Sequence, residues 1–280
     1  MGKYLWIVKT LVILGLCAVI FIPAAYFSYE LFIRPNQIPP EEAQAAATPP
    51  PDPSLPELEK ALDIKGKRNL LEARTALEEF LENYPYSTRL GDAEKALGQV
   101  NTDIFFSAIP APEKTRYEVK KGDALEKIER KLKTTRELLM RCNNLEDPRR
   151  LSVGQVLFVN EADFSLLIDR KSQTVTIFNH TRFFKKYTPL EWHTPAPRKG
   201  AAQVPISAKV RDKVAWYNGV RVLFGSREYA SSTRWVDFTV KGFTFYSEEG
   251  PKPTGGIVFS AGDMEELSTL LGKNVPVSIQ

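Results

Sequence analysis

Hydrophobic and polar residues follow three different patterns along the 280-residue chain. Residues 10–29 are uncharged throughout, residues 55–107 carry apolar residues three and four positions apart, and from residue 164 onward short apolar runs alternate with polar positions. The second pattern is typical of amphipathic helices and the third of half-buried strands. The chain is therefore predicted to be a multidomain α+β protein that begins with an apolar segment.

The uncharged run at residues 10–29 has the length that a helix needs to cross about 30 Å of hydrocarbon. We expect residues 1–33 to be a transmembrane signal anchor, because cleavage after Ala24 or Ala25 would not leave small residues at both positions that a signal peptidase reads. A cleaved signal peptide is the alternative. Lysines precede the run and mostly glutamates follow it, so we expect a single-pass protein of the bacterial cytoplasmic (inner) membrane. Its N-terminus is expected inside and its other domains in the extracytoplasmic or periplasmic space.

The next two segments are predicted to be an extended Pro/Ala-rich linker at residues 34–54 and a helical region at residues 55–110. Pro85 ends the first long helix, and Ser87 is the expected N-cap of the second. Their apolar stripes are Leu70, Ala73, Leu77, Phe80, Leu81 and Tyr84, then Leu90, Ala93, Leu97, Val100 and Ile104. The pair resembles one tetratricopeptide-type (TPR-like) helical hairpin. Because a single hairpin leaves an apolar face uncovered, we expect it to pack on a neighbouring part of the chain or on a shorter helix near Leu58, and an envelope protein partner is the alternative.

Residues 115–160 predict a compact β-α-α-β unit. A strand at residues 117–119 leads into a Lys-Gly-Asp turn at residues 121–123, and Leu157 and Val159 belong to a closing strand. Two polar helix starts lie between these strands, and each has an acidic residue three positions after its first residue.

The expected helix starts are capping boxes formed by Asp123 with Glu126 and by Thr134 with Glu137. In the second helix Cys142 is expected to turn inward as a small buried hydrophobe, with a reactive thiol as the alternative. Both helices are short, so their inward faces must share one small core with the two strands.

This unit resembles a LysM domain along its whole length, through Y-x-V-x-x-G-D-x-L-x-x-I, the Thr-Thr helix start, L-L-M-R-x-N-x-L and L-x-V-G-Q-x-L-x-V. The resemblance implies binding of glycan that contains N-acetylglucosamine, usually peptidoglycan, in a shallow groove between two loops. The residues it places there are Gly122, Asp123, Ala124 and Leu125 in the first loop, and Asn144, Leu145, Glu146, Asp147, Pro148 and Leu151 in the second. One such module is expected to bind weakly.

Residues 163–280 are predicted to be mostly β, and their end carries a second resemblance. The segment GGIVFSAGDMEELSTLLGKNVPVSI fits without gaps the active-site segment of L,D-transpeptidases, S-H-G-C-x-R followed by a short helix and a V-x-I strand. Asp263 and Glu266 are the expected capping box of that helix. The aromatic residues upstream are expected to be a β core, with a sugar- or peptide-binding face as the alternative: Trp216, Tyr217, Phe224, Tyr229 and Trp235.

At the positions that this alignment assigns to the catalytic residues of L,D-transpeptidases, the chain carries other residue types. The alignment places Gly256 at the nucleophilic cysteine, Val258 at the arginine and Thr254 at the histidine, with Tyr246 and Ser247 at an upstream His-Gly pair. Acyl transfer by this route needs a thiolate, a base and oxyanion donors. The resemblance therefore implies a degenerate domain with no catalytic residues.

An active enzyme with a non-standard site is the alternative to that interpretation. Its nucleophile would be Ser247, Thr254 or Ser260, but the sequence places no histidine to activate any of them.

Composition and charge exclude several classes of function and site. The net charge of +4 is spread along the chain without a dense Lys/Arg stripe, which argues against nucleic-acid binding. The only cysteines are Cys17, in the apolar run, and Cys142, so no disulfide is expected. His180 and His193 are the only histidines and show no ligand spacing, so neither a metal nor a cofactor is expected.

The leading hypothesis is thus a non-catalytic, membrane-anchored envelope protein that binds peptidoglycan glycan, with its last domain in a binding or scaffolding role. A cell-wall enzyme and a helical-hairpin adaptor for another envelope protein are the alternatives.

Overall fold

The computed structural model describes residues 52–196 and 205–280. The predicted membrane anchor, Cys17 and nearly all of the predicted linker lie outside the described residues. Within these two ranges no helix is both long and apolar enough to cross a bilayer. Residues Pro53–Gln280 form one compact unit.

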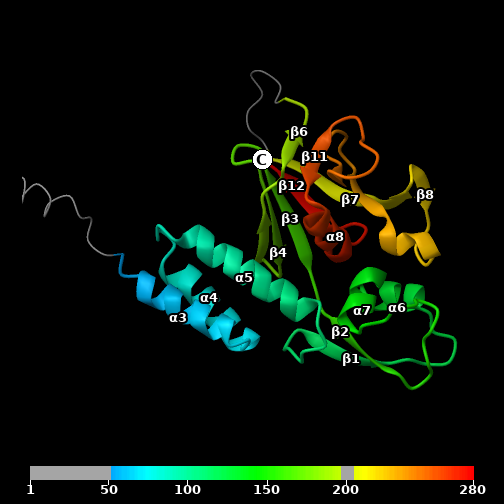
Figure 1. Cartoon of the computed structure of the whole chain (residues 1–280), viewed down its shortest axis with the longest axis horizontal. Coiled ribbons are helices and arrows are strands. Elements are labelled where there is room, and N and C mark those ends of the chain that lie inside the picture. The colour runs from blue at the N-terminus through cyan, green and yellow to red at the C-terminus, as the bar shows by residue number, and fades with distance from the viewer. Residues whose placement is uncertain (1–51, 197–204) are drawn as a thin grey trace, which may run out of the picture. The chain divides into compact units, whose positions relative to one another are not determined.

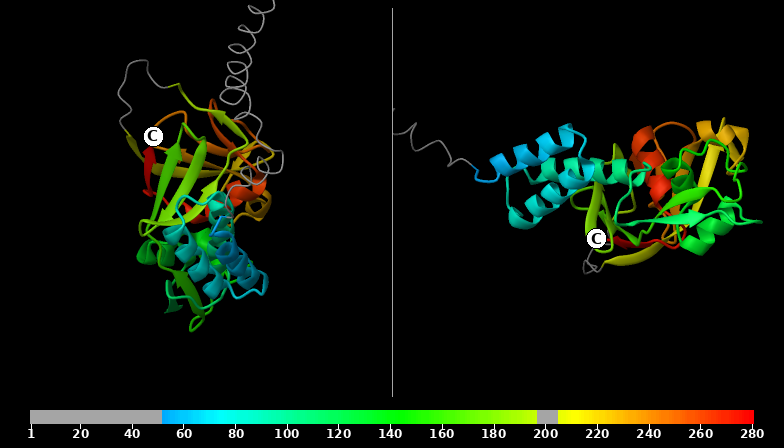
Figure 2. Two further views of the ribbon diagram at one scale, coloured as in Figure 1. Left: turned by 90° about the vertical axis from the view of Figure 1, so that its left-hand side faces the viewer. Right: turned by 90° about the horizontal axis from the view of Figure 1, so that it is seen from below.

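Three helices open this unit: α3 (Leu55–Gly66), α4 (Leu70–Asn83) and α5 (Leu90–Phe105). They pack side by side in Figure 2, and Leu58 and Ala61 of α3 are buried against both later helices. The two predicted apolar stripes form the rest of this core. The predicted packing on a shorter helix is confirmed.

The start of α5 corrects one expectation. Ser87 is not the N-cap of α5, because the helix begins at Leu90 and its N-cap position is Arg89. The Ser87 hydroxyl instead accepts a hydrogen bond from the backbone N–H of Arg89 at 3.1 Å. Ser87 therefore stabilises the turn after Pro85 and lies two residues before the observed N-cap position, Arg89.

The predicted βααβ module is confirmed. Its elements are β1 (Lys114–Glu118), α6 (Leu125–Leu132), α7 (Arg136–Cys142) and β2 (Val156–Asn160), and the two strands pair antiparallel (Figure 1). One small core joins them, made of Val119, Leu125, Ile128, Leu139, Leu157 and Val159. Thr135, not Thr134, caps α7, because its hydroxyl accepts from the backbone N–H of Leu138 at 3.1 Å.

In the described residues after the module, ten strands form one mixed sheet. They are β3 (Phe164–Asp169), β4 (Thr174–Asn179), β5 (Arg182–Tyr187), β6 (Glu191–His193), β7 (Ile206–Tyr217), β8 (Val220–Val222), β9 (Thr233–Phe238), β10 (Phe245–Ser247), β11 (Gly256–Phe259) and β12 (Pro276–Ile279). The order is β5-β4-β3-β12-β7-β9-β10-β11-β6, and β8 pairs with β7. The β3–β12 and β10–β11 pairs are parallel. The prediction of a mostly β segment is confirmed.

Period-two burial explains the first strands of this sheet. Phe164, Leu166 and Ile168 of β3 are buried, and the residues between them are half-buried. The Asp169 carboxylate stabilises the turn between β3 and β4. It accepts hydrogen bonds from the backbone N–H groups of Lys171 and Ser172, at 2.8 and 3.1 Å.

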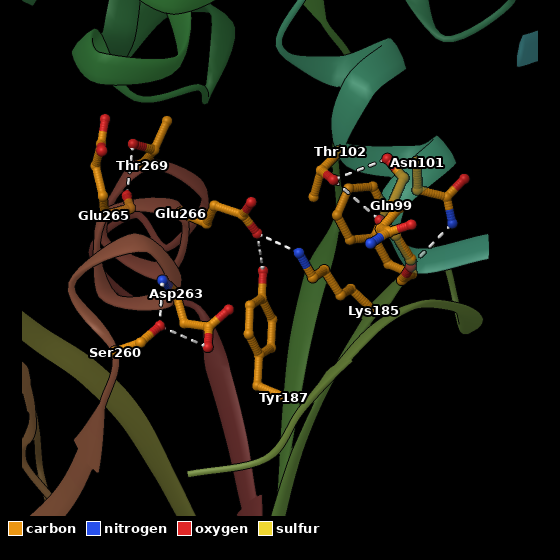
Figure 3. A network of polar contacts seen from close by, with 12 residues as sticks. Gln99, Asn101, Thr102, Lys185, Tyr187, Ser260, Asp263, Glu265, Glu266 and Thr269 are labelled. Carbon is orange, nitrogen blue, oxygen red and sulfur yellow. Dashed lines mark hydrogen bonds and ion pairs between the residues drawn. The ribbon is translucent and has the colours of Figure 1, made fainter. Parts of the chain in front are cut away.

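Helix α8 (Ala261–Leu270) packs its apolar side chains against the sheet. Its N-cap is Ser260, whose hydroxyl accepts from the backbone N–H of Asp263 at 3.1 Å. The predicted capping box of Asp263 with Glu266 is therefore wrong. The Glu266 carboxylate instead bonds to Lys185 and Tyr187 of β5, as Figure 3 shows.

Helix α5 covers the edge strand β5. The buried side-chain amide of Asn101 donates to the backbone carbonyl of Phe184 at 2.9 Å (Figure 3). Phe105 of α5 packs with Phe164 and Phe184 at centroid distances of 5.8 and 4.8 Å. The helix thus satisfies a free edge carbonyl and buries an apolar edge that would otherwise be open to pairing with another chain.

The βααβ module also joins the sheet domain directly. The Thr135 hydroxyl donates to the backbone carbonyl of Thr269 in α8 at 2.5 Å. The side-chain amide of Asn160 donates to the backbone carbonyl of Phe105 at 3.0 Å, which joins the module to α5 as well. Leu138 lies in the sheet core. As predicted, Cys142 is buried, and its thiol donates to the Ser107 carbonyl at 3.2 Å.

The aromatic contact between α5 and the sheet generates a stability prediction. We expect Phe184→Ala to lower the free energy of unfolding by about 3 kcal/mol, because it leaves a cavity between two packed elements. Tyr86→Ala is the control, since Tyr86 is 97% exposed, and it should change stability by less than about 0.5 kcal/mol. Urea denaturation followed by circular dichroism measures both. Equal midpoints for the two variants would contradict the packing.

Candidate functional site: two loops of the βααβ module and the Gly256 corner

The first loop, between β1 and α6, is closed by one carboxylate. Asp123 accepts hydrogen bonds from the backbone N–H of Lys120 and from the hydroxyl of Tyr117, both at 2.8 Å. These two bonds hold the pKa of Asp123 below its usual range. Helix α6 has no side-chain cap, so the predicted capping box with Glu126 is wrong and Asp123 closes the turn instead.

The rest of this loop offers mainly backbone to solvent. Gly122 has a φ of +87° and open space around its Cα, which suits a glycine in a tight turn. Gly122 and Ala124 are exposed, whereas Leu125 is 3% exposed and belongs to the module core. A ligand on this loop would therefore meet peptide groups and not the Leu125 side chain.

The second loop runs from Asn144 to Leu151. Asn144 follows α7 with a φ of +51°, a conformation that asparagine tolerates better than most residues. Leu145 and Leu151 are half-buried against the module core. The Asp147 carboxylate accepts from the Nε and backbone N–H of Arg149 at 3.0 and 2.9 Å, which lowers the pKa of Asp147. The loop is thus fixed by its own contacts.

One residue that positions this loop was not assigned a role from the sequence. The side-chain amide of Asn143 donates to the carbonyls of Leu139 and Phe158, both at 2.8 Å, and accepts from the Phe158 N–H at 2.7 Å. Asn143 therefore ties the end of α7 to β2. The signal was its place in the L-L-M-R-x-N-x-L motif, but the motif alone does not give its partners.

Gly256, the first residue of β11, is enclosed by its neighbours. Its φ of +136° lies in a region that residues with a Cβ rarely adopt. A Cβ there would overlap the carbonyl oxygen of Thr244 and lie 3.1 Å from Cε1 of Tyr246. Burial, and then the charge of Glu191, raises the pKa of the Tyr246 hydroxyl above its usual value. We call the surroundings of Gly256 in β10, β11 and β6 the Gly256 corner.

The arginine position of the transpeptidase-like alignment and the three hydroxyl residues considered as nucleophiles have the following surroundings. Val258 is 1% exposed, so the arginine position lies in an apolar environment. Ser247 is buried and its hydroxyl accepts from the Glu249 N–H at 3.2 Å, while Ser260 caps α8. Thr254 is exposed. Within residues 52–196 and 205–280, none of these three hydroxyl groups forms a hydrogen bond with a histidine.

The Gly256 corner also contains a histidine. Strand β6 pairs antiparallel with β11 and places His193 opposite Gly256. The Nε2 of His193 lies 2.7 Å from a carboxylate oxygen of Glu191, and this contact lowers the pKa of Glu191. Sequence reasoning missed this neighbour, because only strand pairing brings β6 to β11. His193 is thus a strand neighbour of Gly256, and its side chain is 52% exposed. The expectation that no histidine activates Ser247, Thr254 or Ser260 stays a prediction.

Comparison with protein families decides the identity of the module that contains the two loops. Residues 117–160 are a LysM domain. The match runs from β1 to the end of β2 and includes both loops. No curated protein matches the chain.

Solved structures with a similar chain path include L,D-transpeptidases. Those of Enterococcus faecium and Stackebrandtia nassauensis are each 16% identical, with TM-scores of 0.29 and 0.28, over 42% of this chain and 50% and 55% of theirs. An L,D-transpeptidase of Xylanimonas cellulosilytica is 12% identical with a TM-score of 0.27, over 61% of this chain and all of that chain. This chain spans about half the length of the first two.

The second LysM loop lines a cavity of about 1080 Å³ together with the sheet-domain segment 224–234. We call it the interdomain cavity. Pro148 of the loop lies 3.4 Å from where a Cβ of Gly225 would be. Phe224 and Tyr229, at a centroid distance of 5.0 Å, form part of its other wall. The first loop does not line this cavity.

The aromatic residues of this region are not the β core that their sequence suggested. Trp216 and Trp235 pack on each other at 4.9 Å and are half-buried, and Tyr217 is 37% exposed. The core of the sheet is made by other residues, among them Val236, Phe238, Phe245 and Phe259.

A buried ion pair fixes the LysM domain next to this cavity. The Glu137 carboxylate of α7 forms an ion pair with the Lys213 ammonium at 3.0 Å. It also accepts a hydrogen bond from the Tyr229 hydroxyl at 2.7 Å. Burial alone would raise the pKa of Glu137, but Lys213 and Tyr229 outweigh it and hold the pKa below its usual range. Among the described residues no group of three potential metal ligands occurs.

The geometry at Gly256 gives a testable consequence. We expect Gly256→Cys to lower the free energy of unfolding by about 3 kcal/mol, because the side chain needs a strained φ and overlaps the Thr244 carbonyl. Gly262→Cys is the matched control, since a Cβ there meets open space. Chemical denaturation under reducing conditions compares them. A Gly256→Cys variant as stable as the control would contradict the enclosed geometry.

The Glu137 ion pair predicts a pH dependence. At pH 7 we expect Glu137→Gln to cost about 3 kcal/mol, because it leaves the Lys213 ammonium buried without a counter-charge. Since the folded-state pKa of Glu137 is lowered, this contribution is present above its unfolded pKa of about 4.3 and is lost as the pH falls further. Asp92→Asn, which removes an exposed pair with Arg89, is the control.

Urea denaturation at several pH values between 7 and 3 measures this difference. The gap between wild type and Glu137→Gln should narrow below about pH 4. A gap that stays constant over this range would show that the carboxylate charge does not stabilise the interface.

Proposed function

We propose that this protein is anchored in the bacterial cytoplasmic membrane and binds the N-acetylglucosamine-containing glycan of peptidoglycan through its LysM domain. In this proposal its C-terminal domain is a non-catalytic scaffold. The observation that carries the proposal is the complete LysM frame, in which Asp123 and Asn143 fix two loops whose exposed residues include Gly122, Ala124 and Asn144.

Glycan binding by these loops follows from the groups they present. Exposed peptide groups at Gly122 and Ala124 can donate to and accept from acetamido groups, and half-buried Leu145 and Leu151 can contact sugar faces. Such a shallow site binds weakly. A membrane anchor at residues 1–33, with a linker at residues 34–54, would keep the domain near the wall and raise the local concentration of its ligand.

The non-catalytic role of the C-terminal domain rests on the Gly256 corner. The position that the sequence register assigns to the nucleophile has no side chain, and a Cβ there would collide with the Thr244 carbonyl. Tyr246 and Val258 stand where the register expects a histidine and an arginine. None of these three can supply a thiolate, a general base at neutral pH or a cationic donor.

A cell-wall enzyme remains the second candidate, because His193 and Glu191 form a histidine–carboxylate pair beside Gly256. The adaptor hypothesis needs a helical surface that is free to bind a partner protein. The face of α5 that carries Asn101 and Phe105 is not free, because it covers β5.

Sedimentation of the full-length protein with purified sacculi tests the proposal. We expect wild type to sediment and Ala124→Trp to bind about tenfold more weakly, because an indole on the exposed first loop blocks the groove. Ala261→Trp, a matched change at an exposed position of α8, should bind as wild type. Failure of wild type to sediment at low salt would contradict the proposal.

The same incubation separates scaffold from enzyme. Muropeptide profiles of the sacculi should be unchanged after incubation with wild type. New or lost cross-links that depend on His193, tested with His193→Ala, would establish the enzyme instead.

A further inference from the structure

The interdomain cavity concentrates buried polar atoms that have no hydrogen-bond partner among the described residues. They are Glu137 Oε2, Ser226 Oγ and Arg234 Nε, and all three residues line the cavity. Buried polar atoms normally have partners, so their convergence on one space indicates a polar guest. At about 1080 Å³ the space has the size of a ligand site and not of a single water.

The charges around the cavity favour an anionic group on that guest. The carboxylates of Asp147 and Glu265 are engaged by Arg149 and Arg141, at 3.0 and 3.5 Å. Glu137 is engaged by Lys213. Glu146 also lines the cavity, is exposed and forms no ion pair within the described ranges, so the lining has one unpaired carboxylate and two unpaired guanidinium groups.

Two cations on the sheet-domain side are not neutralised in this way. Arg227 is exposed and forms no ion pair within the described ranges. Arg234 lies over the ring of Tyr229 at 4.6 Å and donates to the Tyr229 carbonyl, which leaves its Nε free. A guanidinium group recognises a carboxylate through paired N–H donors.

The position of the cavity connects it to the glycan loop. Pro148 belongs to the second LysM loop and also lies against Gly225 in the cavity wall. A sugar chain held on that loop would therefore have its substituents next to Phe224 and Tyr229, whose faces suit apolar side chains.

We propose that the interdomain cavity binds the carboxylate-bearing peptide attached to an amino-sugar glycan, with its carboxylate on Arg227 and Arg234. This inference rests on the proposed glycan binding and adds a second contact to it. The chain then distinguishes peptide-substituted glycan from bare glycan, because only the former reaches both surfaces.

Isothermal titration calorimetry of the full-length protein tests this. Two ligands are compared: a peptidoglycan tetrasaccharide that carries its peptides, and the same tetrasaccharide after enzymatic removal of the peptides. Wild type should bind the first about tenfold more tightly. Arg227→Glu, which reverses a charge, and Ala230→Trp, which fills space at the exposed edge of the cavity, should abolish this preference and leave the affinity for the bare sugar unchanged.

Arg68→Glu is the matched control, because Arg68 is an exposed arginine after α3 and does not line the cavity, and it should keep the preference. Equal binding of the two ligands by wild type, or a preference that survives both cavity variants, would overturn the inference and leave glycan binding intact. Binding of neither ligand would overturn the proposed function together with it.

Discussion

The described structure depends on the docking of α7, a helix of seven residues that belongs to two cores at once. Consecutive residues on a helix point about 100° apart. Leu139 therefore packs in the LysM core while Leu138 packs in the sheet core. At the start of the same helix, Thr135 both caps it and donates to the Thr269 carbonyl, and Glu137 meets Lys213. Apolar and polar contacts thus fix one orientation of α7.

This docking determines where the second LysM loop can lie. The loop begins at Asn144, directly after α7, and Asn143 ties the helix end to β2. The loop therefore has little freedom to move relative to the sheet domain, and Pro148 is held against Gly225. In the proposed function, two weak binding surfaces on one rigid unit act on a single ligand without a second loss of translational freedom, so the shallow glycan groove gains affinity and selectivity.

The sequence predicted elements whose signal is local and missed those that depend on distant partners. The stripes of α4 and α5 and the alternation of β3 gave helices and strands correctly. The predicted helix caps were wrong because several polar residues lie near each helix start. Asp123 closes a turn instead of capping α6, and Ser260, not Asp263, is the N-cap of α8. Both LysM loops follow from the motif. The interdomain cavity and the His193 neighbour follow only from docking and strand pairing.

The proposed scaffold role rests on the backbone packing around Gly256 as well as on the missing cysteine. A lost nucleophile could leave an open pocket, but here the Thr244 carbonyl and the Tyr246 ring occupy the space that a Cβ would need. In the proposed scaffold role, position 256 itself supplies no nucleophilic atom and leaves no room for one. A supporting surface requires only a stable sheet. The sheet domain meets that requirement, since it carries Lys213 and Tyr229 to Glu137 and forms the wall opposite the second LysM loop.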